Sequence, residues 1–136
     1  MKISFDDIKN IVDKLDDLIV EDIDVVVGGP PCQSYSTLGK RQLDERANLF
    51  MQYKRIIEIL QPKVFIYENV SGLLTMDKGK LFIKLQCEFE MLGYHLKYRV
   101  LDAADYGVPQ HRERVILVGV KGKNNFSFPK NIRLRI

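Results

Sequence analysis

Short, continuously apolar runs alternate with longer amphipathic segments along this 136-residue chain. The runs at 25–27, 64–67 and 115–120 are rich in β-branched residues, as buried strands are. Between them, residues 48–60 and 79–93 repeat apolar side chains at the spacing of a helix. Strands that are apolar throughout need helices on both faces of their sheet. The pattern therefore predicts a three-layer α/β domain with a mainly parallel sheet.

Capping and breaking residues set the limits of the two helices. Asn48 begins the first helix, Pro62 stops it, and Gly93 ends the second. The second helix carries Cys87 near its apolar side, where a cysteine is most often a small buried hydrophobe. The same periodicities predict a helix with apolar positions from 8 to 18 and strands over 95–107 and 114–120.

Charge and cysteine content limit the class of protein. The net charge of +3 is mildly basic and is uneven, with acidic residues gathered in 1–26 and cations in 110–136. The two cysteines show no CxxC or Cys/His spacing, which predicts neither a disulfide framework nor a metal site. No apolar run approaches the ~20 residues that span a membrane. We expect a cytoplasmic protein without a membrane partner.

Three polar clusters fall at the ends of predicted strands. "GGPPCQSYST" (28–37) and "YENV" (67–70) follow their strands, so they lie on the carboxyl edge of the sheet. "DYGVPQHRER" (105–114) precedes its strand, so it reaches that edge only if the strand is antiparallel. Three polar clusters on one edge would form a pocket.

Cys32 lies in surroundings that a buried structural cysteine does not need. The pair Pro30–Pro31 stiffens the approach to the sulfur, and Lys40 and Arg41 follow in the same long loop. A thiolate is the reactive form of cysteine, and nearby cations favour it. The sequence therefore favours Cys32 as a nucleophile over the ordinary small buried hydrophobe.

Glu68 follows an apolar strand directly, and we expect it to be partly desolvated. Burial favours the protonated form of a carboxyl group and would let Glu68 handle a proton near neutral pH. Asn69 could orient it. Taken alone, this motif is more typical of a glutamate that ends a strand and faces water.

Alternation along a strand would place Gln110, Arg112 and Arg114 on one face, with His111 and Glu113 on the outer surface. Three donors on one face suit an anionic or carbonyl-rich ligand. A solvated edge strand would show the same pattern.

The three clusters resemble, in the same order, the motifs of DNA cytosine-5 methyltransferases: "GGPPCQSYS", "ENV" and "YGVPQHRERVILVG". "DERANLF" and "PKVFIYENV" are similar to the segment between them, and the resemblance runs from about residue 5 to residue 120. It implies a partial Rossmann-like S-adenosylmethionine-dependent methyltransferase fold that lacks its first strands. Residues 1–123 would be the catalytic half of that domain, and 124–136 the start of a target-recognition region or a tail.

The resemblance also implies the role of each catalytic residue. Cys32 matches the nucleophile that adds to C6 of cytosine, and Glu68 matches the residue that binds N3 and the exocyclic amine. Arg114, supported by Arg112, matches the arginine that holds the O2 carbonyl. The base must leave the stack of double-stranded DNA, under a loop that matches residues 33–46. The DNA-binding residues would be Gln33, Ser34, Ser36, Lys40, Arg41 and Gln110.

S-adenosylmethionine is the methyl donor that the resemblance implies, and Asp7, Ile8, Pro31 and Leu49 match positions beside it. No glycine-rich turn precedes Asp7, and two matching positions differ from the family by having Asp6 and Ala47 in place of glycine. We therefore expect that the chain alone neither binds the donor tightly nor methylates DNA. A complementary chain could complete it, and an uncovered sheet edge could cause self-association.

Three alternatives remain open at this point. A cytosine-5 methyltransferase that acts on transfer RNA shares most of these motifs. A non-catalytic remnant or a subunit of a split methyltransferase would also carry them. An unrelated α/β domain with thiol chemistry would need a histidine beside its cysteine, and His95 and His111 lie in no such context.

Overall fold

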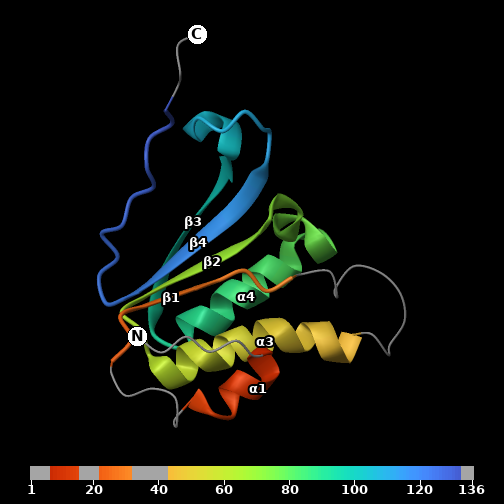
Figure 1. The fold of residues 1–136 in the computed structure, drawn as a ribbon, viewed down its shortest axis with the longest axis vertical. Helices are drawn as coiled ribbons and strands as arrows, with labels where there is room; N and C mark the ends of the chain where they lie inside the picture. The colour runs from red at the N-terminus through yellow and green to blue at the C-terminus, as the bar shows by residue number, and fades with distance from the viewer. Residues whose placement is uncertain (1–6, 16–21, 32–42, 133–136) are drawn as a thin grey trace.

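The computed structural model describes residues 7–15, 22–31 and 43–132, in which four strands form one sheet beside a layer of helices (Figure 1). The strands are β1 (Val25–Gly28), β2 (Val64–Val70), β3 (Tyr94–Asp102) and β4 (Glu113–Lys121). The α-helices are α1 (Ile8–Val12), α3 (Leu43–Leu60) and α4 (Lys80–Glu90). Three 3-10 helices are η1 (Ser71–Leu74), η2 (Met76–Gly79) and η3 (Ala103–Tyr106).

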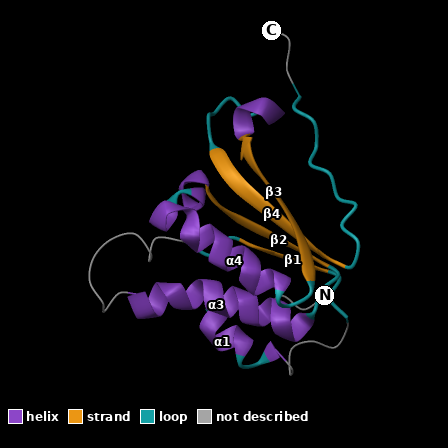
Figure 2. Cartoon of the chain, turned by 180° about the vertical axis from the view of Figure 1, so that it is seen from behind, coloured by secondary structure: helices purple, strands orange, loops and turns teal. Residues whose placement is uncertain are grey.

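The order of strands in the sheet is β1-β2-β4-β3. β1 pairs with β2 in parallel, whereas β4 runs antiparallel to both of its neighbours. The helices lie on one face of this sheet (Figure 2). The predicted α/β class is confirmed. The described part has two layers, and its sheet is mixed because only the β1–β2 pair is parallel.

Antiparallel β4 satisfies the condition set by the sequence. Its first residues lie at the edge where β2 ends, since Val70 pairs with Arg114 across the two strands. β1 ends at the same edge, where Gly28 pairs with Tyr67. The described parts of the three polar clusters therefore meet at one edge of the sheet, with residues 32–37 of the first cluster outside the described ranges.

The ends of the elements follow local backbone chemistry. α3 begins five residues before the predicted Asn48 and ends at Leu60, followed by Gln61 with a φ of 45° and then by Pro62. Gly79 and Gly93, with φ of 83° and 90°, flank α4 in the left-handed region that glycine adopts without strain. The strand predicted over 95–107 stops at Asp102, because the chain enters η3 there.

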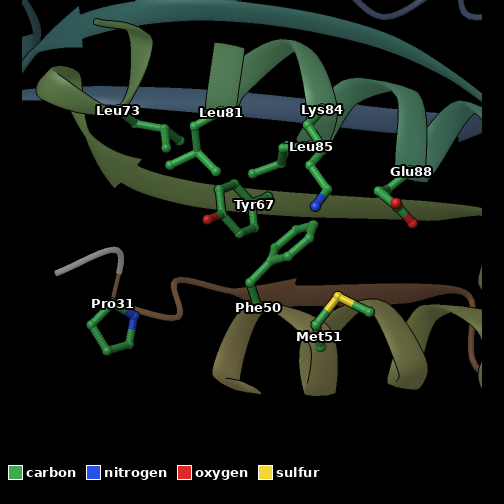
Figure 3. Close-up of a pocket in the computed structure, with 9 residues that line it drawn as sticks. All are labelled: Pro31, Phe50, Met51, Tyr67, Leu73, Leu81, Lys84, Leu85 and Glu88. Carbon is green, nitrogen blue, oxygen red and sulfur yellow. The ribbon is translucent and has the colours of Figure 1, made fainter. Parts of the chain in front are cut away.

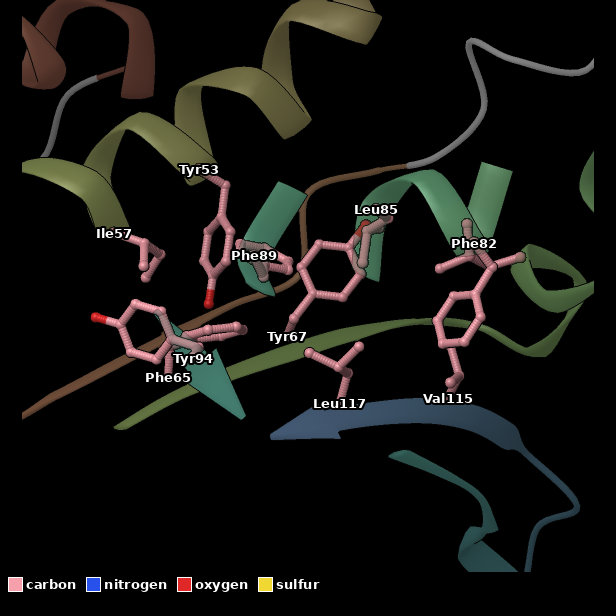
Figure 4. Close-up of a cluster of buried hydrophobic side chains, with 11 residues drawn as sticks. Tyr53, Ile57, Phe65, Tyr67, Phe82, Leu85, Phe89, Tyr94, Val115 and Leu117 are labelled. Carbon is pink, nitrogen blue, oxygen red and sulfur yellow. The ribbon is translucent and has the colours of Figure 1, made fainter. Parts of the chain in front are cut away.

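Aromatic side chains dominate the core between the sheet and the helices (Figure 4). Phe65 from β2 lies 4.4 Å from Phe89 of α4, measured between ring centroids, and Tyr53 of α3 lies 5.5 Å from Tyr67. The Phe65 ring lies over Gly119, where an added Cβ would come within 2.2 Å of it. With Tyr94 of β3, whose ring lies 5.0 Å from that of Phe65, the core contains rings from four elements.

Cys87 is exposed, so the prediction that it is buried is wrong. α4 buries Phe82, Leu85 and Phe89, which recur at the three- and four-residue spacing of one helix face. Position 87 lies two residues from both Leu85 and Phe89, roughly 200° around a helix with 3.6 residues per turn. The helix therefore turns Cys87 to the solvent.

The segment after β4 runs back along β3. Asn124 Nδ2 donates to the His95 carbonyl oxygen (2.8 Å), and Lys97 Nζ donates to that of Phe126 (2.7 Å). The amide of Ile132 donates to the carbonyl oxygen of Asp105 (2.7 Å). Residues 124–132 are thereby tied from one end of β3 to η3. Among the described residues, no helix combines the length and apolarity that crossing a membrane requires.

Candidate active site at the carboxyl edge of β1 and β2

The turn after β1 lies directly against the end of β2. Asn69 Nδ2 donates to the Pro30 carbonyl oxygen (2.8 Å) and to the Tyr67 hydroxyl (2.9 Å). Its Oδ1 accepts from the amide of Val70 (2.9 Å), and the side chain is almost fully buried. Asn69 therefore binds the turn that leads to Cys32. Its neighbour Glu68 extends from the other face of the strand, so the predicted orienting role of Asn69 acts on the turn instead.

Glycine at position 29 permits the close contact between this turn and Glu68. A Cβ at Gly29 would lie 2.6 Å from Glu68 Oε2 and 3.2 Å from the Glu68 carbonyl oxygen. The first distance is shorter than real Cβ contacts, so the end of the Glu68 side chain would have to move, and the second is tight enough to require a small shift of the backbone. Glycine at position 29 therefore lets the turn and the carboxylate approach each other without displacing Glu68.

Arg114 holds the other side of the Glu68 carboxylate. Arg114 Nε lies 2.9 Å from Glu68 Oε1, and Arg114 Nη1 donates to the Glu113 carbonyl oxygen (2.7 Å). The side chains are 25% and 41% exposed respectively, so the pair is partly shielded but still open to a ligand. Hydrogen bonds between charged groups are roughly twice as strong as neutral ones. A carboxylate and a guanidinium are thus held side by side at the sheet edge.

The segment before β4 differs from its predicted form. β4 begins at Glu113, so Gln110 and Arg112 precede the strand and the expectation that they share a strand face with Arg114 is wrong. Both are exposed, as the predicted surface residues His111 and Glu113 are. The cause is Asp102, whose Oδ1 accepts the backbone amide of Arg112 (2.9 Å). This bond replaces the ladder bond that a longer strand would make.

Asp102 is a residue that the sequence reasoning missed. Its Oδ1 also accepts from the amide of Ala104 (3.1 Å), and its Oδ2 lies 2.8 Å from His111 Nδ1. These contacts, the His111 bond first and then the two amides, lower the pKa of Asp102 to about 2. An aspartate immediately before "AADYG" was the available signal, because aspartate is a preferred capping residue at helix starts.

Pro31 lies at one end of an apolar pocket between α3 and α4 (Figure 3). Phe50 and Tyr67 line it from α3 and β2, and Lys84 and Glu88 of α4 are its charged residues. Glu88 pairs with Lys54 of α3. The complete described lining is Pro31, Phe50, Met51, Tyr67, Leu73, Leu81, Lys84, Leu85 and Glu88.

The predicted cofactor residues are spread over three elements. Pro31 is exposed in the turn after β1, and Leu49 is partly buried on α3. Asp7 is exposed at the start of α1, where its carbonyl oxygen accepts from the amides of Asn10 and Ile11 (2.9 and 3.0 Å). Ile8 is partly buried in α1. The four residues thus offer three apolar side chains and one carboxylate.

The structure brings together Gly29, Glu68 and Arg114, and it leaves Gln110 and Arg112 exposed in the segment that precedes β4. Such a site can accept hydrogen bonds from an amine through the carboxylate and donate to a carbonyl through the guanidinium. Several predicted residues lie outside the described ranges: Cys32, Gln33, Ser34, Ser36, Lys40 and Arg41.

Comparisons with known proteins found both sequence relatives and similar structures. The chain is 40% identical over 121 residues to the Type II methyltransferase M.Bpa9945I of Bacillus paralicheniformis, covering 79% of this chain and 27% of that protein. It is 51% identical over 104 residues to the Type II methyltransferase M.XorII of Xanthomonas oryzae, covering 74% and 24%. A DNA modification methyltransferase encoded within an E. coli prophage superimposes with a TM-score of 0.66 at 30% identity, covering 85% and 32%.

The chain spans about a quarter to a third of the length of these relatives. The family model described as C-5 cytosine-specific DNA methylase matches residues 1–134, which is nearly the whole chain. The match includes all three polar clusters and the turn, carboxylate and guanidinium that the fold places at one edge. The chain therefore belongs to the C-5 cytosine-specific DNA methylase family.

Proposed function

We propose that this chain supplies the base chemistry of an enzyme that methylates C5 of cytosine in double-stranded DNA. One observation carries the proposal: the Glu68 carboxylate lies between the backbone of Gly29 and the guanidinium of Arg114. The turn that makes this contact leads within three residues to Cys32. A thiol, an acid and a guanidinium are the three groups that this reaction requires of the protein.

Cytosine C5 is a poor nucleophile because its electrons belong to an aromatic ring. Addition of the Cys32 thiolate to C6 breaks that aromaticity and leaves an enamine in which C5 can attack an electrophile. Negative charge then develops on the ring. The protonated carboxyl group of Glu68 would donate its proton to N3 and accept from the exocyclic amine with its other oxygen, while Arg114 would donate to O2, so that both groups stabilise that charge. Loss of the C5 proton and departure of Cys32 restore the aromatic ring.

The described residues fit part of the methyl donor. S-adenosylmethionine supplies, when bound, a methyl group on a positively charged sulfur. Pro31 and Leu49 would contact its apolar portions, with Ile8 beside them, and the exposed Asp7 carboxylate would accept from the adenine amine. The rest of the donor's polar groups would be held by residues beyond those the structure describes here.

DNA would meet the same edge of the sheet. A cytosine within a duplex is inaccessible to Cys32, so the base must be extruded from the stack. Gln110 and Arg112 are exposed in the segment that leads to Arg114, and they would contact the displaced strand or its phosphates. The loop residues that would add to this contact are Gln33, Ser34, Ser36, Lys40 and Arg41.

The free edge of the sheet is where the remainder of a methyltransferase domain would join. β1 is the terminal strand of the described sheet, and Val25 and Val27 on its outer face are 51% and 68% exposed. An apolar strand at a sheet edge favours pairing with another strand. We propose that another segment of a methyltransferase, on the same or a complementary chain, covers it, and that the chain alone self-associates there. Residues 1–123 would then be the catalytic half, and 124–136 the start of a target-recognition region or a tail.

A chimera tests the proposed function: this chain replaces the matching part of one of its relatives, and transfer of labelled methyl groups to duplex DNA is measured. We expect Cys32→Ala to abolish transfer and Glu68→Gln to reduce it strongly. Gly29→Ala should lower the rate about 100-fold, because a displacement of an ångström costs that much, whereas Gly72→Ala should not. Gly72 is the matched control, since a Cβ there meets nothing within 4 Å.

Two outcomes of this experiment would contradict the proposal. Equal rates for the Gly29→Ala and Gly72→Ala chimeras would show that the contact with Glu68 does not matter. Inhibition by transfer RNA at lower concentrations than by duplex DNA would favour the RNA substrate, which neither the family model nor the names of the curated relatives supports.

A further inference from the structure

The Asp102 carboxylate uses its two oxygens for different partners. Oδ1 accepts two backbone amides, those of Arg112 (2.9 Å) and Ala104 (3.1 Å). Oδ2 faces the imidazole of His111, whose Nδ1 lies 2.8 Å away. The amide of Ala103 donates in turn to the carbonyl oxygen of Arg112 (3.1 Å). The backbone at Arg112 is thus bound through both its N–H and its C=O.

These hydrogen bonds of Asp102 and Ala103 with the backbone, here called the Asp102 clamp, lie at the end of the β3–β4 ladder, next to the candidate site. Asp102 pairs with Glu113 and Leu101 pairs with Arg114, as the last two partners in that ladder. One residue therefore separates the clamped Arg112 from the arginine that contacts Glu68. If the Asp102 clamp opened, the terminal pair Asp102–Glu113 would be free to fray, and the backbone that carries Arg114 would no longer be held in place.

The charges around the clamp act mainly on the imidazole. The negative charges of Asp102, Asp105 and Glu113 raise the pKa of His111, with the Asp102 hydrogen bond as the largest cause. The imidazole side chain is 92% exposed, while that of Asp102 is 23% exposed. The contact through Oδ2 is therefore with a solvated ring, whereas Oδ1 serves two backbone groups.

We propose that Asp102 is a positioning residue: its Oδ1 fixes the backbone at Arg112 and thereby holds the guanidinium of Arg114 against Glu68, independently of His111. The placement of Arg114 by Asp102 is a property of this chain alone. The effect of that placement on catalysis rests on the function proposed above. Asp102 acts through Arg114 and does not itself touch the base.

Three variants separate the two oxygens. Asp102→Asn keeps an Oδ1 that can accept both amides and removes the charge. His111→Gln removes the imidazole alone. Asp102→Ala removes both contacts. Nitrogen-edited NMR of the chain reports the Arg114 Nε–H group and the exchange rate of the Arg112 amide.

We expect the Arg112 amide of the unsubstituted chain to be protected although its side chain is exposed. Asp102→Ala should speed its exchange about tenfold or more, in line with the loss of a hydrogen bond to a charged group, and should shift the Arg114 Nε–H signal. Asp102→Asn and His111→Gln should leave both signals close to those of the unsubstituted chain.

Three results would overturn the proposal. The first is an unprotected Arg112 amide in the unsubstituted chain, which can be observed even if Asp102→Ala fails to fold. The second is an Asp102→Asn variant in which both signals are lost. The third is a His111→Gln variant that behaves like Asp102→Ala.

These NMR signals are measured without DNA or methyl donor, so they test the positioning role of Asp102 even if the proposed function is wrong. In the active chimera, Asp102→Ala should lower kcat, and it should have no further effect once Arg114 is replaced by alanine. A purely structural residue would give additive losses. Additive losses in the double variant would therefore reject the positioning role.

Discussion

Replacement of Asn69 by alanine should be the most disruptive change that leaves the aromatic core intact. The side chain is only 5% exposed, and it connects three groups: the carbonyl oxygen of Pro30, the hydroxyl of Tyr67 and the amide of Val70. The first of these bonds alone ties the turn after β1 to β2. Alanine removes all three hydrogen bonds and leaves their partners poorly solvated.

The size of the effect follows from the number of bonds. A typical hydrogen bond within a protein contributes about 1 kcal/mol net, so three give a loss of about 3 kcal/mol in the free energy of unfolding. That loss corresponds to roughly a hundredfold change in the unfolding equilibrium. A single exposed bond should contribute far less. Thr75 makes such a bond, from its hydroxyl to the carbonyl oxygen of Gly72 (3.1 Å), and Thr75→Ala is the matched control.

Urea unfolding, followed by circular dichroism, measures both variants against the unsubstituted chain. We expect a lower midpoint for Asn69→Ala at an unchanged slope, and a shift within about 0.5 kcal/mol for Thr75→Ala. If Asn69→Ala were as stable as the Thr75→Ala control, the turn would not be held by this side chain. The account of how the turn reaches Glu68 would then be refuted.

Three further predictions concern the core, the surface and pH. Gly119→Ala should destabilise the chain by about 1–3 kcal/mol in the same urea assay, because its Cβ would meet the Phe65 ring at 2.2 Å; an unchanged midpoint would contradict this packing. The free energy of unfolding of Cys87→Ser should stay within about 0.5 kcal/mol of the parent's, since the thiol is exposed. In the folded parent, the Cys87 thiol should react at once with a thiol reagent. The pKa of His111 is raised in the folded chain, so its pairing with Asp102 stabilises the chain fully below the ordinary histidine pKa of 6.5 and is lost as pH rises through the folded pKa. The contribution of Asp102 is present above its ordinary pKa of 3.8 and is lost only as pH falls toward its folded pKa of about 2. The stability difference between the parent and His111→Gln should therefore be present at about pH 5 and absent at about pH 9; a difference that grows with pH would refute the pairing.

The sequence predicts the elements whose patterns are local. The period of the apolar residues locates α3 and α4, and the glycine after the first apolar strand locates the end of β1. The approach of three clusters to one edge also follows from strand order and direction, once β4 is antiparallel. These features depend on repetition and backbone chemistry, which are visible in the residues themselves.

The residues that the sequence misplaced depend on partners far along the chain. The alternation of polar residues suggests that Gln110 and Arg112 lie on a strand. The carboxylate of Asp102 instead accepts the backbone amide of Arg112, so the strand begins only at Glu113. Asn69 was expected to act on its neighbour Glu68, and it instead binds a carbonyl 39 residues away. Cys87 was misplaced for a different reason: a helix with two apolar flanks does not reveal which flank the sheet will cover.

The most direct test of the account is the covalent complex with the target base. Duplex DNA with 5-fluorocytosine at the target position cannot lose its C5 substituent as a proton, so the nucleophile stays attached after methyl transfer. Peptide mapping of the complex formed by the chimera should find the DNA on Cys32, with no complex in Cys32→Ser and a much slower one in Arg114→Ala. A complex of normal yield in Cys32→Ser, or DNA attached to another residue, would contradict the claim that the Cys32 thiol attacks the base.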